Sequence, residues 1–343
     1  MNNEISDLRG CLSQLKTLQG RRRYSESEEE ATHSTMFVTK KEDEFLVDEI
    51  RILCSKAYRR LTGKTQVTCL PRNPHIRNRL THTMEVVACS VNVSEMLGLN
   101  TNLVRAIALG HDLGHAPFGH PGEAYLAERT GKPYTHEIMG VVLVQHIERR
   151  CKGLNLTHEV LDGMMRHSGK NVSDSMTPEA WVVRYADKFA YIFADYNDFI
   201  RMQWKVDSEL VSLMNDFGES QRQRVLKVIL ELARESAVEG KVSFVKCDVA
   251  QKFNRLRELM YHEYPKVTLQ NPHRALDPIY DFVDRLKIGD PLLIISLMTD
   301  QDVNYLLQQY ALNFDHIRST AVGELIEVIK DKKIDCCDPD LDW

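Results

Sequence analysis

Two adjacent residues, His111 and Asp112, are the first candidates for chemistry, because imidazole and carboxylate groups both bind divalent metal ions. They end an apolar stretch that begins at Leu103 and repeats with helical spacing, and Gly114 opens a glycine-rich turn directly after them. The turn frees the backbone that a regular helix would fix, so both side chains can face one ion. A histidine–aspartate pair alone arises by chance in a sequence with 13 histidines, so the prediction depends on this context.

Two further residues, His82 and Asp187, complete a candidate metal set. His82 begins an apolar helix directly after the basic segment 77–81. Asp187 lies within another apolar helix and needs a partner there, because an unpaired buried carboxylate is costly. Two imidazoles and two carboxylates suit Mn, Fe, Co, Ni, Zn or Mg, and leave positions open for water and phosphate oxygens. The alternative is a set of unrelated polar residues, which their shared context disfavours.

The helix that carries Asp187 also carries a polar face. Tyr191, Asp195 and Asp198 follow Asp187 by 4, 8 and 11 residues. At about 100° per residue, these side chains project from one side of the helix. The spacing therefore predicts a polar wall of a pocket, although Tyr191 taken alone could be an amphipathic core aromatic.

The elements that must position these residues are predicted to be helices. Helical periodicity covers 43–60, 81–98, 102–113, 136–149, 157–167, 178–203, 207–216, 221–236, 249–263, 275–287, 290–298 and 300–328. A β-rich run at 242–245 predicts a small hairpin or an edge strand. We therefore expect an all-α fold with at most a small β-hairpin, in a single domain over 36–343 that follows a flexible N-terminal arm over 1–35.

Composition narrows the class of protein. The chain has 343 residues with 43% apolar content, which is enough to bury a core without disulfides. Its eight cysteines form no C-x-x-C pair, and no signal peptide or long apolar run is present, so we expect a cytoplasmic protein that does not enter a membrane. A net charge of -5 argues against a general nucleic-acid-coating role.

Four sequence blocks cover 48–52 continuing through 57–61 to 64–67, then 77–82, 111–123 and 187–191. Together these blocks resemble a known family, the HD-domain deoxynucleoside triphosphate triphosphohydrolases, in particular the bacterial deoxyguanosine triphosphate triphosphohydrolase-like branch. The third block is the most specific, because it extends well beyond a histidine–aspartate pair. The resemblance covers the metal-site core at about 45–200 and is much weaker in the helical C-terminal part, 205–343.

The resemblance implies a role for each matching residue. The implied metal ligands are His82, His111, Asp112 and Asp187, in agreement with the set derived above. The implied catalytic residues are His115, His120, Glu123 and His136, and the implied substrate contacts are Gln66, Arg79, Lys188, Tyr191 and Asp195. The implied cofactor is a divalent metal ion, and the implied assembly is a homo-oligomer.

Some of these residues also have simpler interpretations. His115 could be a capping or orienting histidine, and His136 could be a surface histidine at the start of a helix. The run Arg59–Arg60 favours an ordinary solvated helix face over a phosphate entrance. His167 matches a family block, but the sequence assigns it no role.

The expected activity is hydrolysis of a deoxynucleoside triphosphate at its α-phosphorus, which gives a deoxynucleoside and intact triphosphate. dGTP is the leading candidate substrate. The alternatives are a phosphomonoesterase or phosphodiesterase that acts on another nucleotide, and a catalytically silent nucleotide sensor. Arg79, Lys188 and Gln66 disfavour the first alternative, and retention of His120 and Glu123 disfavours the second.

Overall fold

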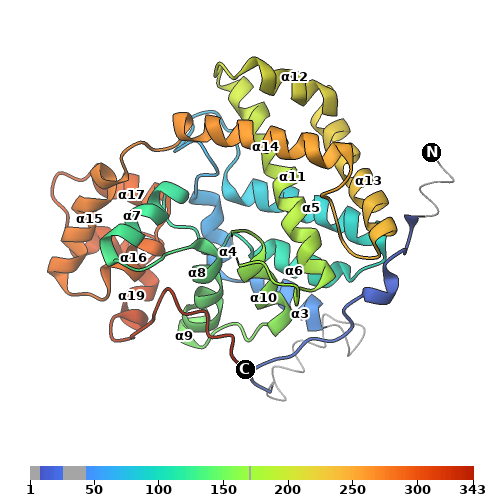
Figure 1. The fold of residues 1–343 in the computed structure, drawn as a ribbon. Coiled ribbons are helices and arrows are strands. Elements are labelled where there is room, and N and C mark those ends of the chain that lie inside the picture. Colours follow the sequence, from blue (N-terminus) through green and yellow to red (C-terminus); the bar gives the residue numbers. More distant parts are fainter. Residues whose placement is uncertain (1–7, 26–43, 170) are drawn as a thin grey trace. The chain divides into compact units, whose positions relative to one another are not determined.

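The structure is a computed structural model that describes residues 8–25, 44–169 and 171–343, and every regular element within these ranges is a helix (Figure 1). Only two isolated bridges, Arg22 with Thr157 and Thr65 with Asn78, have β-type pairing there. The predicted all-α class is confirmed. In chain order the helices are η1 Ser13–Leu15, α3 Glu44–Leu53, α4 Lys56–Arg60, η2 Leu61–Gly63, α5 Arg79–Leu97, α6 Thr101–Gly110, α7 His120–Thr130, α8 His136–Val142, η3 Leu143–Ile147, α9 Glu148–Cys151, α10 His158–Arg166, α11 Pro178–Arg201, α12 Ser208–Phe217, α13 Gln221–Glu239, α14 Asp248–Val267, α15 Pro272–Leu286, α16 Pro291–Ser296, α17 Asp300–Leu307, α18 Phe314–Arg318 and α19 Gly323–Ile329.

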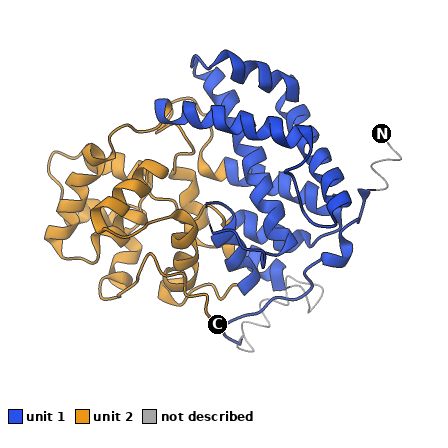
Figure 2. Ribbon diagram, in the orientation of Figure 1, with its two compact units in different colours: residues 1–50, 82–109, 157–266 blue, residues 51–81, 110–156, 267–343 orange. Residues whose placement is uncertain are grey.

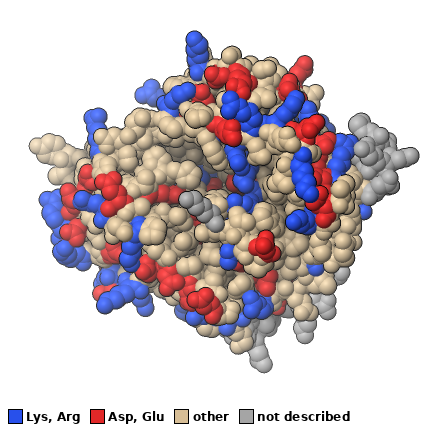
Figure 3. Space-filling view, viewed as in Figure 1, with Lys and Arg blue, Asp and Glu red and all other residues tan. Residues whose placement is uncertain are grey.

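Contacts divide the chain into two compact units (Figure 2). Unit 1 comprises residues 1–50, 82–109 and 157–266, and unit 2 comprises residues 51–81, 110–156 and 267–343. The organisation as a single domain over 36–343 stays a prediction. In the part of the chain that the structure describes, no helix is long and apolar enough to span a membrane. Figure 3 shows basic and acidic side chains interspersed on the visible face.

The long helix α11 is the central element of unit 1. Thr177 caps it by accepting a hydrogen bond from the amide of Ala180, and Pro178 occupies its first turn, where a missing N–H costs nothing. Its apolar side meets an aromatic cluster in which Phe189 and Phe193 both contact Phe253 edge to face. This packing leaves the opposite, polar side of α11 for chemistry.

Residues 8–25, within the predicted N-terminal arm, pack against the helices of unit 1 as part of that unit. Leu12 is buried, and the amide and hydroxyl of Thr17 donate to the Glu179 carboxylate at 3.1 and 2.7 Å. Arg22 pairs with the buried Asp48 at 2.6 Å. This part of the predicted arm is therefore packed, and the remainder, 1–7 and 26–35, lies outside the described residues.

The β-rich run 242–245 forms no strand in the described structure, and groups of the segment 243–247 instead donate to the carboxylate of Glu235 on α13. The amides of Val245 and Cys247 donate to Glu235 at 2.7 and 3.0 Å, and the Ser243 hydroxyl donates at 2.7 Å. Because these donors already have an acceptor, the run needs no partner strand. Although burial opposes the change, these hydrogen bonds lower the pKa of Glu235 to about 2.

Glu235→Gln is expected to lower the free energy of unfolding by about 2 kcal/mol at pH 7, because it removes the charged acceptor. Since the folded pKa is below the unfolded value of about 4.3, the charged group stabilises fully above that value. Its contribution is lost as the pH falls toward 2. Urea unfolding at pH 7 and pH 3.5 should therefore give a smaller difference at the lower pH, and a constant difference would contradict the assignment.

Unit 2 is built from shorter helices than the periodicity predicts. The segment expected as one helix over 300–328 is three helices, α17, α18 and α19. Asn313 begins α18 with a capping box, and a Cβ at Gly323 would meet the carbonyl oxygen of Arg318 at 2.0 Å. The segment expected as one helix over 136–149 changes to π geometry at Leu143. These breaks are set by caps and close backbone contacts, which apolar periodicity does not record.

Candidate active site

The residues His111 and Asp112 follow α6 directly and both are buried in unit 2. Their ligand atoms are close, with His111 Nε2 at 3.4 Å from Asp112 Oδ1. The other carboxylate oxygen of Asp112 accepts a hydrogen bond from Arg79 Nη1 at 2.9 Å. Burial by itself raises the pKa of Asp112, but His111, Arg79 and His115 hold it well below its usual range. Asp112 is therefore a carboxylate in the folded protein.

The turn after Asp112 packs against α8 backbone to backbone. A Cβ at Gly114 would lie 2.1 Å from the carbonyl oxygen of His136 and 2.2 Å from the amide nitrogen of Gly140. Tyr134 closes the same contact, because its hydroxyl donates to the carbonyl oxygen of Gly114 at 3.1 Å. Only glycine permits this approach, which sets the position of His136 at the start of α8.

Gly114→Ala is expected to lower the free energy of unfolding by about 3 kcal/mol, because the added methyl must push α8 away. Turnover should also fall, since α8 carries His136. Gly131→Ala is the matched control, because Gly131 ends α7 with φ +66° and open space around its Cβ. It should cost about 1 kcal/mol of backbone strain and leave turnover unchanged. Equal effects of the two variants, measured by thermal unfolding and by turnover, would contradict the packing argument.

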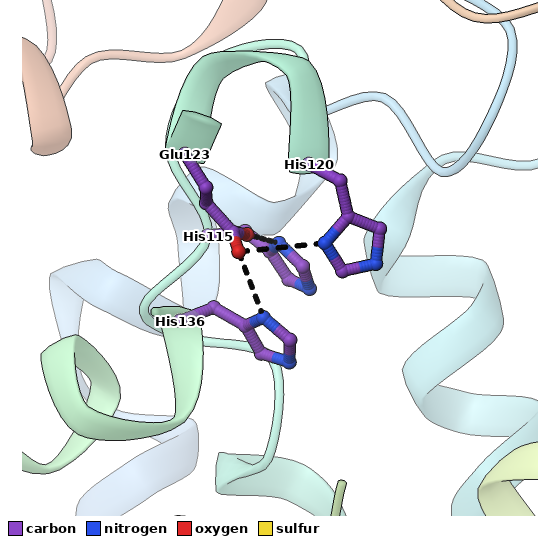
Figure 4. A group of neighbouring side chains, drawn as sticks. All are labelled: His115, His120, Glu123 and His136. Carbon is purple, nitrogen blue, oxygen red and sulfur yellow. Dashed lines mark hydrogen bonds and ion pairs between the residues drawn. The ribbon is translucent and has the colours of Figure 1, made fainter. Parts of the chain in front are cut away.

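Three histidines of unit 2 converge on one carboxylate, Glu123 (Figure 4). Glu123 lies in the first turn of α7, His120 begins that helix, and His136 begins α8. The Nδ1 atom of His115 pairs with one carboxylate oxygen, and the Nδ1 atoms of His120 and His136 lie 3.4 and 3.3 Å from the other. The rings of His115 and His136 are stacked, with centroids 3.6 Å apart. We call these four residues the histidine–glutamate cluster.

Burial and charge separate the protonation states within this cluster. Burial, with the charges of Arg79 and His136, lowers the pKa of His115 to about 3. Burial would lower the pKa of His136 too, but the carboxylates of Glu123 and Glu137 raise it to about 9. Burial raises the pKa of Glu123, yet the three histidines hold it well below its usual range. Adjacent imidazoles that differ in protonation suit proton transfer.

The exposure of the histidines distinguishes their possible roles. His120 keeps 75% of its side chain exposed, whereas His115 and His136 are buried. His136 does begin a helix, but it is 4% exposed, so it is not a surface histidine. His115 also contacts Asp112, with Nε2 at 3.1 Å from Oδ1. It therefore links the predicted metal ligand Asp112 to Glu123.

Unit 1 holds the other two predicted ligands, His82 on α5 and Asp187 on α11. Their side chains are buried and adjacent, with His82 Nε2 at 3.1 Å from Asp187 Oδ1. Each unit thus offers a buried pair of one imidazole and one carboxylate, which are donors that borderline divalent ions accept. The residues present therefore fit a divalent metal ion.

The remaining predicted substrate residues of unit 1 lie on or beside α11. The Tyr191 hydroxyl lies 2.9 Å from that of Tyr261, and Asp195 accepts from the Tyr264 hydroxyl at 3.0 Å. Both of these tyrosine partners lie on α14, outside the residues that the sequence predicted for the site. Burial, with Arg184 and Arg257, lowers the pKa of Lys188 to about 8.

Not every residue of the predicted polar face of α11 is available for a ligand. Asp198 pairs with Arg201 at 2.6 Å. The ring centroid of Tyr191, in contrast, lies 6.5 Å from that of His82. The polar wall therefore extends from Asp187 through Tyr191 to Asp195.

The basic residues of the 59–66 segment differ in burial, which the sequence did not predict. Arg59 is exposed, as a solvated helix face requires, but Arg60 is buried and pairs with Glu148 at 3.6 Å. Lys64, which had no predicted role, is 1% exposed and its Nζ donates to the carbonyl oxygen of His115. Burial, with Arg60 and Arg79, lowers the pKa of Lys64 to about 7.

Two other residues from the sequence prediction have simple local positions. Gln66 is half-buried, and within the described residues its Oε1 has no hydrogen-bond partner. His167 is buried at the end of α10, where its Nδ1 lies 2.7 Å from the carbonyl oxygen of Met164. Gln66 thus keeps an acceptor for a ligand, whereas His167 has a local structural contact.

Comparison with known proteins agrees with this site. Residues 79–192 match the family model of the HD domain, which includes all four predicted metal ligands. This match defines the class of protein as HD-domain, with a histidine and aspartate set suited to a divalent metal ion.

Curated relatives identify the family within that class. The chain is 36% identical over 239 residues to the deoxyguanosinetriphosphate triphosphohydrolase-like protein of Clostridium tetani, in a match that covers 67% of this chain and 68% of the relative. It is 39% identical over 259 residues to the protein of the same name from Desulfatibacillum aliphaticivorans, with 71% and 70% covered. The chain belongs to the family of deoxyguanosinetriphosphate triphosphohydrolase-like proteins, which are metal-dependent HD-domain phosphohydrolases.

Proposed function

We propose that this protein hydrolyses a deoxynucleoside triphosphate, with dGTP as the leading candidate, to a deoxynucleoside and intact triphosphate. The observation that carries the proposal is the histidine–glutamate cluster, which adjoins Asp112 and Arg79 within unit 2. Proton-transfer groups beside a metal ligand and a guanidinium are the parts that phosphate ester hydrolysis requires. The names of the relatives favour dGTP among the possible substrates.

We propose that His82, His111, Asp112 and Asp187 hold one divalent metal ion, which would be Mn, Mg, Fe, Co, Ni or Zn. The two buried imidazole–carboxylate pairs, at 3.1 and 3.4 Å, support this set. When bound, such an ion polarises a phosphate oxygen and lowers the pKa of a coordinated water.

The chain's own residues would direct the proton transfers. Water attacks the α-phosphorus and loses a proton, the bond from phosphorus to the 5′-oxygen breaks, and that oxygen gains a proton. We assign the donor role to His120, because it is the exposed member of the cluster and can meet a substrate. Glu123 would hold the Nδ1 side of all three imidazoles, which leaves Nε2 of His120 and His136 for the reaction, while Nε2 of His115 contacts Asp112. His115 and His136 would then relay protons and orient the attacking water.

Binding of the substrate would use the side chains of Arg79, Lys188, Gln66, Tyr191 and Asp195. Arg79 donates from Nη1 to Asp112, while its buried Nε has no hydrogen-bond partner in the described structure, so it can serve a phosphate. Lys188 would add a second cation. Gln66 would contact the sugar 3′-hydroxyl through its amide, and Tyr191 with Asp195 would line the sugar.

The test is to incubate the purified protein with each deoxynucleoside triphosphate and one divalent metal at a time, and then to resolve the products. Release of intact triphosphate with the deoxynucleoside supports the proposal, and the fastest substrate identifies the base. Release of pyrophosphate or single phosphates would contradict attack at the α-phosphorus and favour another phosphoesterase activity. Binding without product, across all metals, would favour the nucleotide sensor.

The cytoplasmic location and the homo-oligomeric state stay predictions. Light scattering of the purified protein, with and without substrate, tests the second of these.

A further inference from the structure

A buried aspartate at the start of α17, Asp300, bonds to two segments that carry predicted site residues in unit 2. Asp300 is 0% exposed. Its Oδ2 accepts from the amide of Thr65 at 3.2 Å, and its Oδ1 accepts from the amide of Phe118 at 2.9 Å. Thr65 precedes Gln66, and Phe118 lies between His115 and His120 in the turn that leads into α7.

The carboxylate of Asp300 is not needed to cap its own helix. Thr299 and Asp302 already form a complete capping box at the start of α17, in which the amide of Asp302 donates to Thr299 at 3.1 Å. Both oxygens of Asp300 are therefore available to bind the two loops. The start of α17, which carries Asp300, is fixed by the capping box of Thr299 and Asp302.

The turn that Asp300 holds is one that requires a restraint. Phe118 and Gly119 have φ values of +67° and +64°, a left-handed conformation that a non-glycine residue such as Phe118 rarely adopts. The same turn passes close to Arg79, because a Cβ on Gly119 would lie 2.8 Å from Arg79 Nη2. A looser turn would therefore move His120 and disturb Arg79 together.

The other segment held by Asp300 is tied to Arg79 as well. The amide of Arg79 donates to the carbonyl oxygen of Lys64 at 3.1 Å, and Thr65 forms an isolated bridge with Asn78. Lys64 reaches the same turn through its bond to the carbonyl oxygen of His115. The carboxylate of Asp300 thus joins the segment of Gln66 and Arg79 to the turn of His115 and His120.

We propose that Asp300 is a positioning residue, whose carboxylate keeps the histidine turn in register with the segment that carries Gln66. This inference rests on the proposed function, because it assigns catalysis to that turn. Asp300 would not touch the substrate and would act through the backbone of Thr65 and Phe118.

The deciding experiment compares Asp300→Asn with Glu148→Gln. Asparagine keeps the shape of aspartate but turns an N–H group toward one of the two amides, so one bond must break. Glu148 is a comparable buried carboxylate in unit 2, since it accepts from the amides of Lys56 and Ala57 at 3.1 and 2.8 Å, and it also pairs with Arg60. Both variants should lose similar thermal stability.

Asp300→Asn is expected to lower kcat by about tenfold or more with KM changed less than about threefold, while Glu148→Gln keeps the kcat of wild type. Hydrogen exchange at the segments around Thr65 and Phe118 should accelerate in Asp300→Asn alone. Equal kcat values in the two variants, or a change confined to KM, would overturn the inference.

The experiment also distinguishes failure of the proposed function from failure of the role proposed for Asp300. Wild-type protein that releases no triphosphate overturns the proposed function, whereas active wild type with an active Asp300→Asn overturns only the role of Asp300. If Asp300→Asn does not fold, Gly63→Ala replaces it, because a Cβ there would lie 3.0 Å from Thr299 Cβ and shift the start of α17. That variant should show the same kcat loss in weaker form, and unchanged kcat would again contradict the proposal.

Discussion

His111→Ala is expected to lower kcat by at least about 1000-fold, equivalent to about 4 kcal/mol of transition-state stabilisation. Nε2 of His111 lies 3.4 Å from Oδ1 of Asp112 and the side chain is buried, so alanine removes one of the four proposed ligands. Metal content should fall with activity. Turnover assays with added metal and elemental analysis of the purified variant measure the two effects.

Asp187→Ala, in unit 1, should reproduce the loss of both metal and turnover, because the two residues are proposed to hold the same ion. His146→Ala is the matched control, since His146 is half-buried in unit 2 and its contact is with Asp340 at 3.8 Å. It should keep both metal and activity. Full activity in His111→Ala or Asp187→Ala, with the helical circular dichroism of wild type, would contradict the ligand assignment.

Glu123→Gln is expected to lower kcat by about 100-fold to 1000-fold, which is the range for loss of positioned acid–base groups. Glutamine carries no negative charge, so it cannot pair with the three Nδ1 atoms as the Glu123 carboxylate does. All three imidazoles therefore lose their common anchor. Metal content should stay at the wild-type level, because Glu123 is not a proposed ligand. The contrast with His111→Ala separates proton transfer from metal binding.

Glu137→Gln provides the graded control for Glu123. Glu137 is also buried in unit 2, and its carboxylate lies 3.5 Å from Nδ1 of His136. We expect a loss of kcat below about tenfold for this variant. An equal loss of kcat in the two variants would show that the two carboxylates affect catalysis equally, and would contradict the central role of Glu123.

The contrast between α11 and the C-terminal helices shows how far periodicity predicts this fold. The long helix over 178–203 was predicted within two residues of Pro178–Arg201, because its apolar face, its cap at Thr177 and its proline all act locally. The stretch 300–328 was predicted as one helix but is three. The apolar pattern is continuous across this stretch. Its interruptions depend instead on the cap at Asn313 and on the close backbone contact of Gly323 with Arg318.

The run at 242–245 shows a second limit of predicting structure from local sequence. Its residues have high strand propensity, yet the Val245 amide, the Ser243 hydroxyl and the amides just after the run bind the side chain of Glu235 in place of a partner strand. Strand propensity measures how a segment fits a pleated surface, and here no such surface is offered. The acceptor lies on a neighbouring helix, so no local pattern could predict it.

By itself, the sequence determined the chemical identity of the site: which imidazoles and carboxylates are present, on which predicted helices, and in which motif order. It was also sufficient to predict an all-α fold, because helical periodicity is a short-range property. Tertiary structure decided which groups touch. The three imidazoles on Glu123, the bond from Lys64 to His115 and the two bonds of Asp300 join residues that are separated by 3 to 235 positions. Apart from the contact of His120 with Glu123, three residues apart on α7, these contacts follow from packing of segments that are not adjacent in the chain, and no spacing encodes them.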